Sequence, residues 1–117
     1  MIFLQSLVRV RAGHKSSRGN PDDTVPDWSP GAVSRLTVTD LSVQPNTQNE
    51  TTDETRTAVV TGWRVLSAPG TDADIRAEDR IEWDGLTFEV EGEIARWPDP
   101  FDGTTHHIEF VMRRATG

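Results

Sequence analysis

The sequence predicts an all-β fold, a small antiparallel β-barrel or sandwich of about six strands with almost no helix. Short runs rich in β-branched and aromatic residues alternate with clusters of glycine, proline, asparagine and aspartate, which is typical of strands joined by turns. No apolar stripe of helical period extends beyond about ten residues. At 117 residues the chain is expected to form one domain, residues 1–117, around one core.

These turn-forming clusters divide the chain into its expected strands and loops. A first strand is expected over about residues 2–12. Residues 13–31 hold glycines, prolines and aspartates that predict a long loop, and a second strand is expected over residues 32–41. Residues 44–55 contain no aliphatic side chain and predict a second long loop or mobile arm. Residues 57–66, rich in β-branched side chains, predict a third strand.

The last third of the chain begins with a well-marked hairpin. Residues 71–79 are compatible with a single helical turn. Asp84-Gly85 is the pair that a two-residue type I′ turn favours, because both central residues need positive φ. This turn sets a register that places apolar residues opposite one another, and a slip of one residue would destroy the match. The expected pairs are Trp83 with Leu86, Glu82 with Thr87, Ile81 with Phe88 and Arg80 with Glu89.

Charge and composition narrow the function classes. The chain has 12 basic and 19 acidic residues, a net charge of −7, whereas proteins that bind nucleic acid by neutralising phosphates are basic. It has no cysteine, so disulfides and thiolate metal sites are excluded. No run approaches the roughly 20 apolar residues that span a bilayer, so no membrane partner is expected.

A search for reactive groups yields no catalytic, metal or cofactor residue, and the chain is not expected to be an enzyme. No nucleotide-binding, zinc-protease or serine-hydrolase motif occurs. His106 and His107 are adjacent on a predicted strand and are therefore expected on opposite faces, unable to hold one metal ion together. The pairs Asp72 with Asp74 and Asp99 with Asp102 supply too few oxygens for a calcium site and are interpreted as capping and solubilising groups.

Four tryptophans divide into two groups. Trp63 and Trp83 lie in predicted strands and are expected in the core. Trp28 and Trp97 lie beside prolines in predicted loops. Two interpretations stay open for this second pair: they fix their loops to the barrel, or they contact a partner protein, since tryptophan is favoured at interface hot spots.

Several motifs resemble one protein family. The hairpin carries the pattern hydrophobic-Asp-Gly-hydrophobic-Thr-Phe-Glu-Val-x-Gly over residues 83–92, preceded by the loop-ending pair Asp79-Arg80. A linker Trp-Pro-Asp-Pro-Phe-x-Gly covers residues 97–103, and the last strand ends in Arg113-Arg114. With the first strand ending at residues 9–11 and a long polar loop after it, this arrangement resembles the head-to-tail stopper proteins of long-tailed bacteriophages, also called head-closure or head-tail joining proteins. The shared motifs cover most of the chain and are structural.

The resemblance implies a structural virion protein of the neck, assembled in the bacterial cytoplasm. It would form a homo-oligomeric ring of six or twelve copies, six preferred, below the portal-adaptor protein and above the tail terminator or tail tube. The ring would retain DNA in the head, join head to tail, and lie close to genomic DNA in its channel. Two alternatives stay open: another neck or tail component, such as a tail terminator or an adaptor-like protein, and a small β-barrel binding module.

Under this resemblance the two expected loops carry the contacts. The loop at 13–31, whose basic residues also fit an ordinary solvated surface, would face the channel or a neighbouring subunit through His14, Lys15, Arg18, Asn20, Asp27 and Trp28. The loop at 44–55 would contact the adaptor or tail through Gln44, Asn46, Gln48, Asn49, Glu50, Asp53 and Glu54. Structural roles are assigned to Trp83, Asp84, Gly85, Phe88 and Trp97.

Overall fold

The computed structural model describes residues 2–17, 19–52 and 55–115, without the side chains of residues 20–22 and 47–61. In the described residues all regular structure is β, which confirms the predicted fold class. The strands are β1 (Gln5–Arg11), β2 (Gly13–Ser17), β3 (Asn20–Asp27), β4 (Ser34–Thr52), β5 (Thr55–Ser67), β6 (Arg80–Trp83), β7 (Leu86–Pro98) and β8 (Thr105–Arg114). No helix of the described residues is long and apolar enough to cross a membrane.

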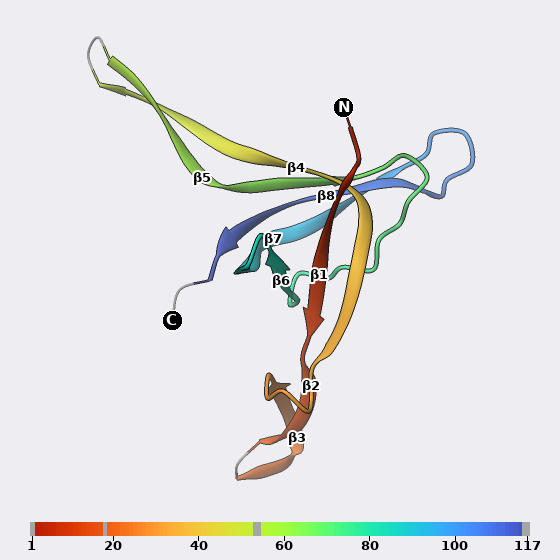
Figure 1. Ribbon diagram of the computed structural model, residues 1–117. Helices are drawn as coiled ribbons and strands as arrows, with labels where there is room; N and C mark the ends of the chain where they lie inside the picture. Colours follow the sequence, from red (N-terminus) through yellow and green to blue (C-terminus); the bar gives the residue numbers. More distant parts are fainter. Residues whose placement is uncertain (1, 18, 53–54, 116–117) are drawn as a thin grey trace.

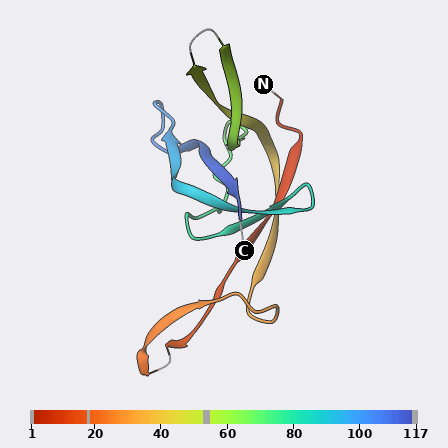
Figure 2. The same cartoon turned by 90° about the vertical axis from the view of Figure 1, so that its left-hand side faces the viewer.

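Six strands close into an antiparallel barrel in the order β1-β4-β5-β8-β7-β6, and β6 pairs back onto β1. The remaining strands, β2 and β3, pair with each other in a separate two-stranded sheet. Figure 1 shows the β2–β3 hairpin extending from one end of the barrel, while the distal halves of β4 and β5 extend from another as a twisted ribbon. The same separation is visible after the quarter turn of Figure 2.

The two extensions make the molecule long for its size. Its radius of gyration is 17.1 Å, whereas a compact domain of this length is expected to have about 13 Å. Its principal extents are 56, 43 and 24 Å. The barrel therefore occupies only the middle of an elongated subunit.

The β6–β7 hairpin confirms the register predicted from the sequence. Trp83 pairs with Leu86, and the next three pairs follow as expected out to Arg80 with Glu89. Asp84 and Gly85 have φ values of 52° and 73°, the positive values that a type I′ turn requires. The turn chemistry and the apolar match thus specify the same register.

The core fills the barrel with alternate residues of its strands. On β8, Ile108, Phe110 and Met112 are buried, as the period of two in a half-buried strand requires. Trp63 and Trp83 pack against the core as predicted, in an edge-to-face pair with ring centroids 4.9 Å apart. The buried cluster consists of Leu7, Val38, Leu41, Val43, Val65, Ala73, Ile75, Ile81, Phe88, Ile108, Phe110 and Met112.

Two segments expected to be loops are strands instead. Residues 13–31 hold β2 and β3, and residues 44–52 extend β4 far beyond the expected strand end at residue 41. Both belong to hairpins that project from the barrel, where the core imposes no apolar alternation on the sequence. The compatible helical turn at residues 71–79 is also absent: this segment is irregular and closes with a turn in which the Asp79 N–H donates to the Arg76 carbonyl at 3.0 Å.

Candidate functional site

The β2–β3 hairpin carries the first group of predicted contact residues. His14 and Lys15 are exposed on β2, and nothing but β3 is paired with this strand in the described chain. An isolated two-stranded hairpin is marginally stable in water, so a protruding one is suited to ordering against a partner. Asn20 begins β3, and Arg18 lies outside the described residues.

The segment after β3 fixes this hairpin to the barrel. The Asp27 carboxylate accepts hydrogen bonds from the Ser29 N–H at 3.0 Å and the Ser29 hydroxyl at 2.7 Å, and these bonds lower the pKa of Asp27. Trp28 is half-buried, and the guanidinium carbon of Arg80 lies 4.0 Å from its ring centroid. Trp28 therefore holds its segment against the β6–β7 hairpin, in line with the first of its two interpretations, while its remaining exposure keeps the second open.

The β4–β5 ribbon carries the second group. Gln44 and Asn46 lie near its base, where the Gln44 side-chain amide donates to the Ser42 hydroxyl at 3.0 Å. Further out, the backbones of Gln48, Asn49 and Glu50 pair with Val59, Ala58 and Thr57. Asp53 and Glu54 lie outside the described residues. The two predicted contact groups are therefore carried by opposite extensions and do not form one site (Figure 1).

An ion-pair cluster that the sequence did not indicate connects β1 to the irregular segment before β6. The Asp79 side chain is fully buried and accepts hydrogen bonds from Arg11 Nε and Nη2, both at 2.9 Å, and from the Arg76 N–H at 2.8 Å. The Asp74 carboxylate forms ion pairs with Arg9 at 3.1 Å and with Arg11 at 3.2 Å. Arg9 is itself buried, whereas the Arg11 side chain keeps 20% exposure.

Electrostatics in this cluster follow from its contacts. The hydrogen bond from Arg11 lowers the pKa of Asp74, against a smaller opposing effect of burial. The hydrogen bond to Asp79 raises the pKa of Arg11, again against burial, with Asp74 contributing further. Both shifts favour the ionised forms. The cluster is a structural clamp that fixes residues 74–79 to the barrel.

The histidine pair differs from its prediction. His106 Nδ1 lies 2.9 Å from His107 Nδ1, so the two rings are neighbours and not on opposite faces. The register of β7 with β8 shifts here, since Trp97 pairs with His107 but Pro98 pairs with Thr105, which leaves His106 as an extra residue in a β-bulge. Strict alternation fails at such a bulge. Among the described residues, no group of three or more His, Asp or Glu side chains is arranged to hold a metal ion.

The aspartate pairs have structural partners. Asp72 forms an ion pair with Arg96 at 2.7 Å, and Asp74 belongs to the cluster above. In the β7–β8 turn, Asp99 Oδ1 accepts the Phe101 N–H at 2.8 Å, and Asp102 Oδ1 accepts the Thr104 N–H at 2.9 Å. Asp99 and Asp102 cap turns, as the sequence interpretation proposed, whereas Asp72 and Asp74 pair with arginines, which it did not foresee.

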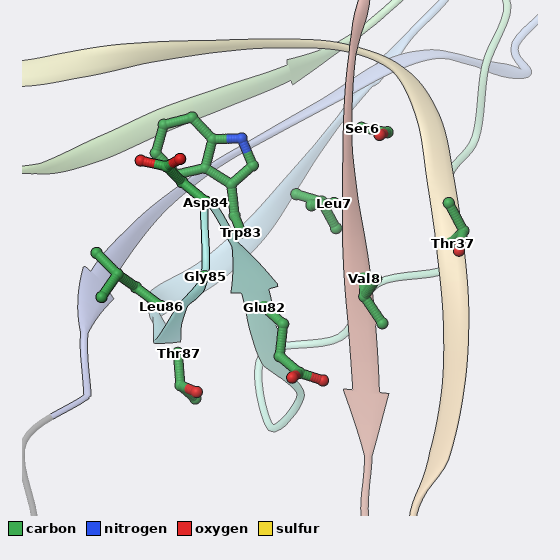
Figure 3. A pocket seen from close by; sticks show the side chains of 10 residues that line it. All are labelled: Ser6, Leu7, Val8, Thr37, Glu82, Trp83, Asp84, Gly85, Leu86 and Thr87. Atoms are coloured by element: carbon green, nitrogen blue, oxygen red, sulfur yellow. The ribbon is translucent and has the colours of Figure 1, made fainter.

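An open hollow of about 370 Å³ lies between β1 and the tip of the β6–β7 hairpin (Figure 3). Leu7, Val8, Trp83 and Leu86 give it an apolar floor, and the remaining lining residues are Ser6, Thr37, Glu82, Asp84, Gly85 and Thr87. This lining contains two carboxylates and no cationic side chain. The hollow is therefore unsuited to a nucleotide or another anionic ligand.

The fold as a whole has a counterpart among solved structures. A chain described as "Virion of native gene transfer agent (GTA) particle" superimposes with a TM-score of 0.53, and the match covers 98% of this chain and 97% of that one. The two sequences are 16% identical, so the similarity shows a shared fold. No protein-family model and no curated protein matches the sequence.

Proposed function

We propose that this chain is a structural protein of a phage-like virion and acts in the neck as a head-to-tail stopper. The observation that carries the proposal is the end-to-end likeness to a chain of a virion particle, which includes 98% of this chain. The stopper-like motifs of the β6–β7 hairpin and of the linker at residues 97–103 support the same position. The proposed role is non-enzymatic.

The shape of the subunit suits a ring. A rigid barrel would form the body, and the two extensions would reach neighbours above, below or beside it (Figure 1). The β2–β3 hairpin, with His14 and Lys15 exposed, is the proposed channel or inter-subunit element, because the ammonium group of Lys15 can approach phosphates. The β4–β5 ribbon is the proposed contact for the adaptor or the tail. A net charge of −7 limits adhesion of sliding DNA elsewhere on the ring.

The mechanism would be steric. About six copies would close a ring whose hairpins narrow the channel after packaging, and their displacement would open it on ejection. The regular structure of the described residues is all β, whereas a predominance of helix would favour an adaptor-like protein. A nucleic-acid binding module is expected to expose aromatic side chains on a basic face. The exposed aromatics of this chain, Trp97 and Phe101, lie instead beside the acidic residues Asp99 and Asp102.

Disruption of the gene in its phage or prophage, followed by electron microscopy of the particles, tests this proposal. Loss of a stopper is expected to give tailless, partly emptied heads beside free, complete tails, and a plasmid copy should restore tailed virions. Heads that keep their DNA beside tails of irregular length would assign the chain to the tail terminator instead. Normal tailed virions would contradict a neck role altogether.

A further inference from the structure

The end of β7 and the turn that follows it display two exposed aromatic side chains. Phe101 is 97% exposed and Trp97 is 49% exposed, and Pro98 and Pro100 between them are exposed as well. Single apolar residues on a surface need no explanation, but a cluster of aromatics and prolines at one protruding tip marks an interaction surface. We call residues 97–102 the aromatic tip.

Hydrogen bonds hold the aromatic tip in one conformation. The Asp99 N–H donates to the Thr104 carbonyl at 2.6 Å, and the Gly103 N–H donates to the Asp99 carbonyl at 2.9 Å. The Phe101 N–H donates to Asp99 Oδ1 at 2.8 Å, and the Thr104 hydroxyl donates to Asp102 Oδ1 at 2.6 Å. A turn that is already ordered loses little entropy on binding, so its exposed ring is well suited to anchor a contact.

The chain also contains a hollow of suitable size and charge. Trp28, Val10, Val33 and Pro30 line a depression of about 200 Å³, together with Arg35, Arg80, Glu82 and Thr87. An apolar cavity of about 150 Å³ accommodates a benzene ring, so a phenyl side chain fits this volume. We call this depression the Trp28 hollow.

Charge favours the Trp28 hollow over the hollow of Figure 3. The aromatic tip carries Asp99 and Asp102, and hydrogen bonds from Thr104 lower the pKa of Asp102. The Trp28 hollow contains the guanidinium groups of Arg35 and Arg80 and one carboxylate, that of Glu82. Arg35 pairs with Glu82 at 2.8 Å, so the hollow keeps one excess positive charge. The larger hollow in Figure 3 offers two carboxylates, which would repel the tip.

A chain cannot fill its own hollow. The aromatic tip joins β7 to β8, whereas the Trp28 hollow lies where the β2–β3 hairpin meets the barrel, and both views place these regions far apart (Figures 1 and 2). A knob and a hollow at separate places on one subunit give a heterologous contact, which generates a ring when the rotation closes. We propose that Phe101 of one copy seats in the Trp28 hollow of the next. This contact rests on the proposed ring and specifies how it is built.

Cysteine cross-linking tests the contact without background, because the chain has no cysteine. Pro100→Cys places a thiol on the tip and Pro30→Cys places one in the lining of the hollow, both at exposed positions. A mixture of the two single variants, one carrying a mass tag, should give a mixed dimer under mild oxidation, and neither variant should dimerise alone. Pro69→Cys, at another exposed turn proline, is the matched control and should remain monomeric with Pro30→Cys.

Further variants separate this contact from other ways of assembling. Phe101→Ser added to Pro100→Cys should weaken the association roughly 30-fold, as expected for loss of a hot-spot anchor. The double variant Pro30→Cys/Pro100→Cys, built into particles, should give a ladder of covalent oligomers that ends at the copy number of the ring. Equal cross-linking by Pro69→Cys, or particles of normal composition without a ladder, would overturn the contact. The second result, combined with a neck defect on gene disruption, would leave the proposed function standing.

Discussion

Removal of the Asp79 carboxylate is the sharpest test of how the barrel is stabilised. This side chain is fully buried, and Asp79→Ala removes the acceptor of Arg11 Nε and of the Arg76 N–H, while Arg11 Nη2 keeps only its contact with Asp74 at 3.2 Å. Breaking a buried ion pair by removing one partner costs about 3–5 kcal/mol. Arg11 keeps 20% exposure and a second partner in Asp74, which places the expected loss near the lower limit, about 3 kcal/mol.

The assay is thermal unfolding followed by tryptophan fluorescence and circular dichroism. For a domain of 117 residues each kcal/mol corresponds to about 4 °C, so Asp79→Ala should lower Tm by roughly 12 °C. Asp72→Ala is the matched control, because it removes an exposed carboxylate from the same segment. It breaks only an ion pair with Arg96, in which the Asp72 side chain is 56% exposed and the Arg96 side chain 38% exposed. Such surface pairs contribute about 0–1 kcal/mol.

A double-mutant cycle with Arg11→Ala separates the pair from secondary effects, and the expected coupling is at least about 1.5 kcal/mol. A free energy of unfolding of Asp79→Ala that lies within about 1 kcal/mol of that of Asp72→Ala would contradict this expectation. Additive losses in the cycle would also contradict it.

Three further predictions follow from individual contacts. Gly85→Ala should lower the free energy of unfolding by about 1–2 kcal/mol, because φ at this position is 73°. Gly31→Ala should be neutral or stabilising, since this position has no positive φ and has open space for a Cβ. Urea unfolding of both variants measures the difference. The lowered pKa of Asp74 stabilises the fold above its unfolded pKa of about 3.9, and this contribution disappears as pH falls through the folded pKa, so Asp74→Asn should show a smaller fall in Tm than wild type from pH 6 to pH 2. Deleting residues 15–22 should leave the barrel's Tm unchanged, because the β2–β3 hairpin pairs only with itself in the described chain, and should impair DNA retention or tail joining; an unfolded variant or full infectivity would count against it.

Local chemistry predicted the parts of the fold that the core determines. The Asp84-Gly85 turn and the apolar matching around it specified the complete register of the β6–β7 hairpin. Trp63 and Trp83 were expected in the core because they lie in predicted strands, and they pack against the buried cluster while staying partly exposed. In these places turn geometry and burial require the same arrangement.

The projecting hairpins were not predictable in the same way. Residues 44–52 lack aliphatic side chains, yet they form a strand because their backbone pairs with residues 55–64 of β5. A strand held by backbone pairing alone needs no alternation of apolar side chains, so its sequence carries no signal that predicts it. The bulge at His106 and the pairing of Arg11 with Asp79, 68 positions apart, depend on tertiary placement that no local pattern encodes.

The contact surfaces illustrate the same division. The sequence placed Trp97 beside prolines in a predicted loop, but the almost complete exposure of Phe101 became evident only from the turn that projects it. Asp99 and Asp102 could be interpreted as capping groups because short polar side chains in turns bind nearby N–H groups. The opposite placement of the two predicted contact segments required the barrel topology.

Electron cryomicroscopy of purified virions, focused on the junction between head and tail, tests the central claim most directly. We expect a ring of about six copies there, in which this barrel fits with its β2–β3 hairpin toward the channel or a neighbouring subunit. Density for the chain in the capsid shell or along the tail shaft, or a neck that contains no such barrel, would contradict it.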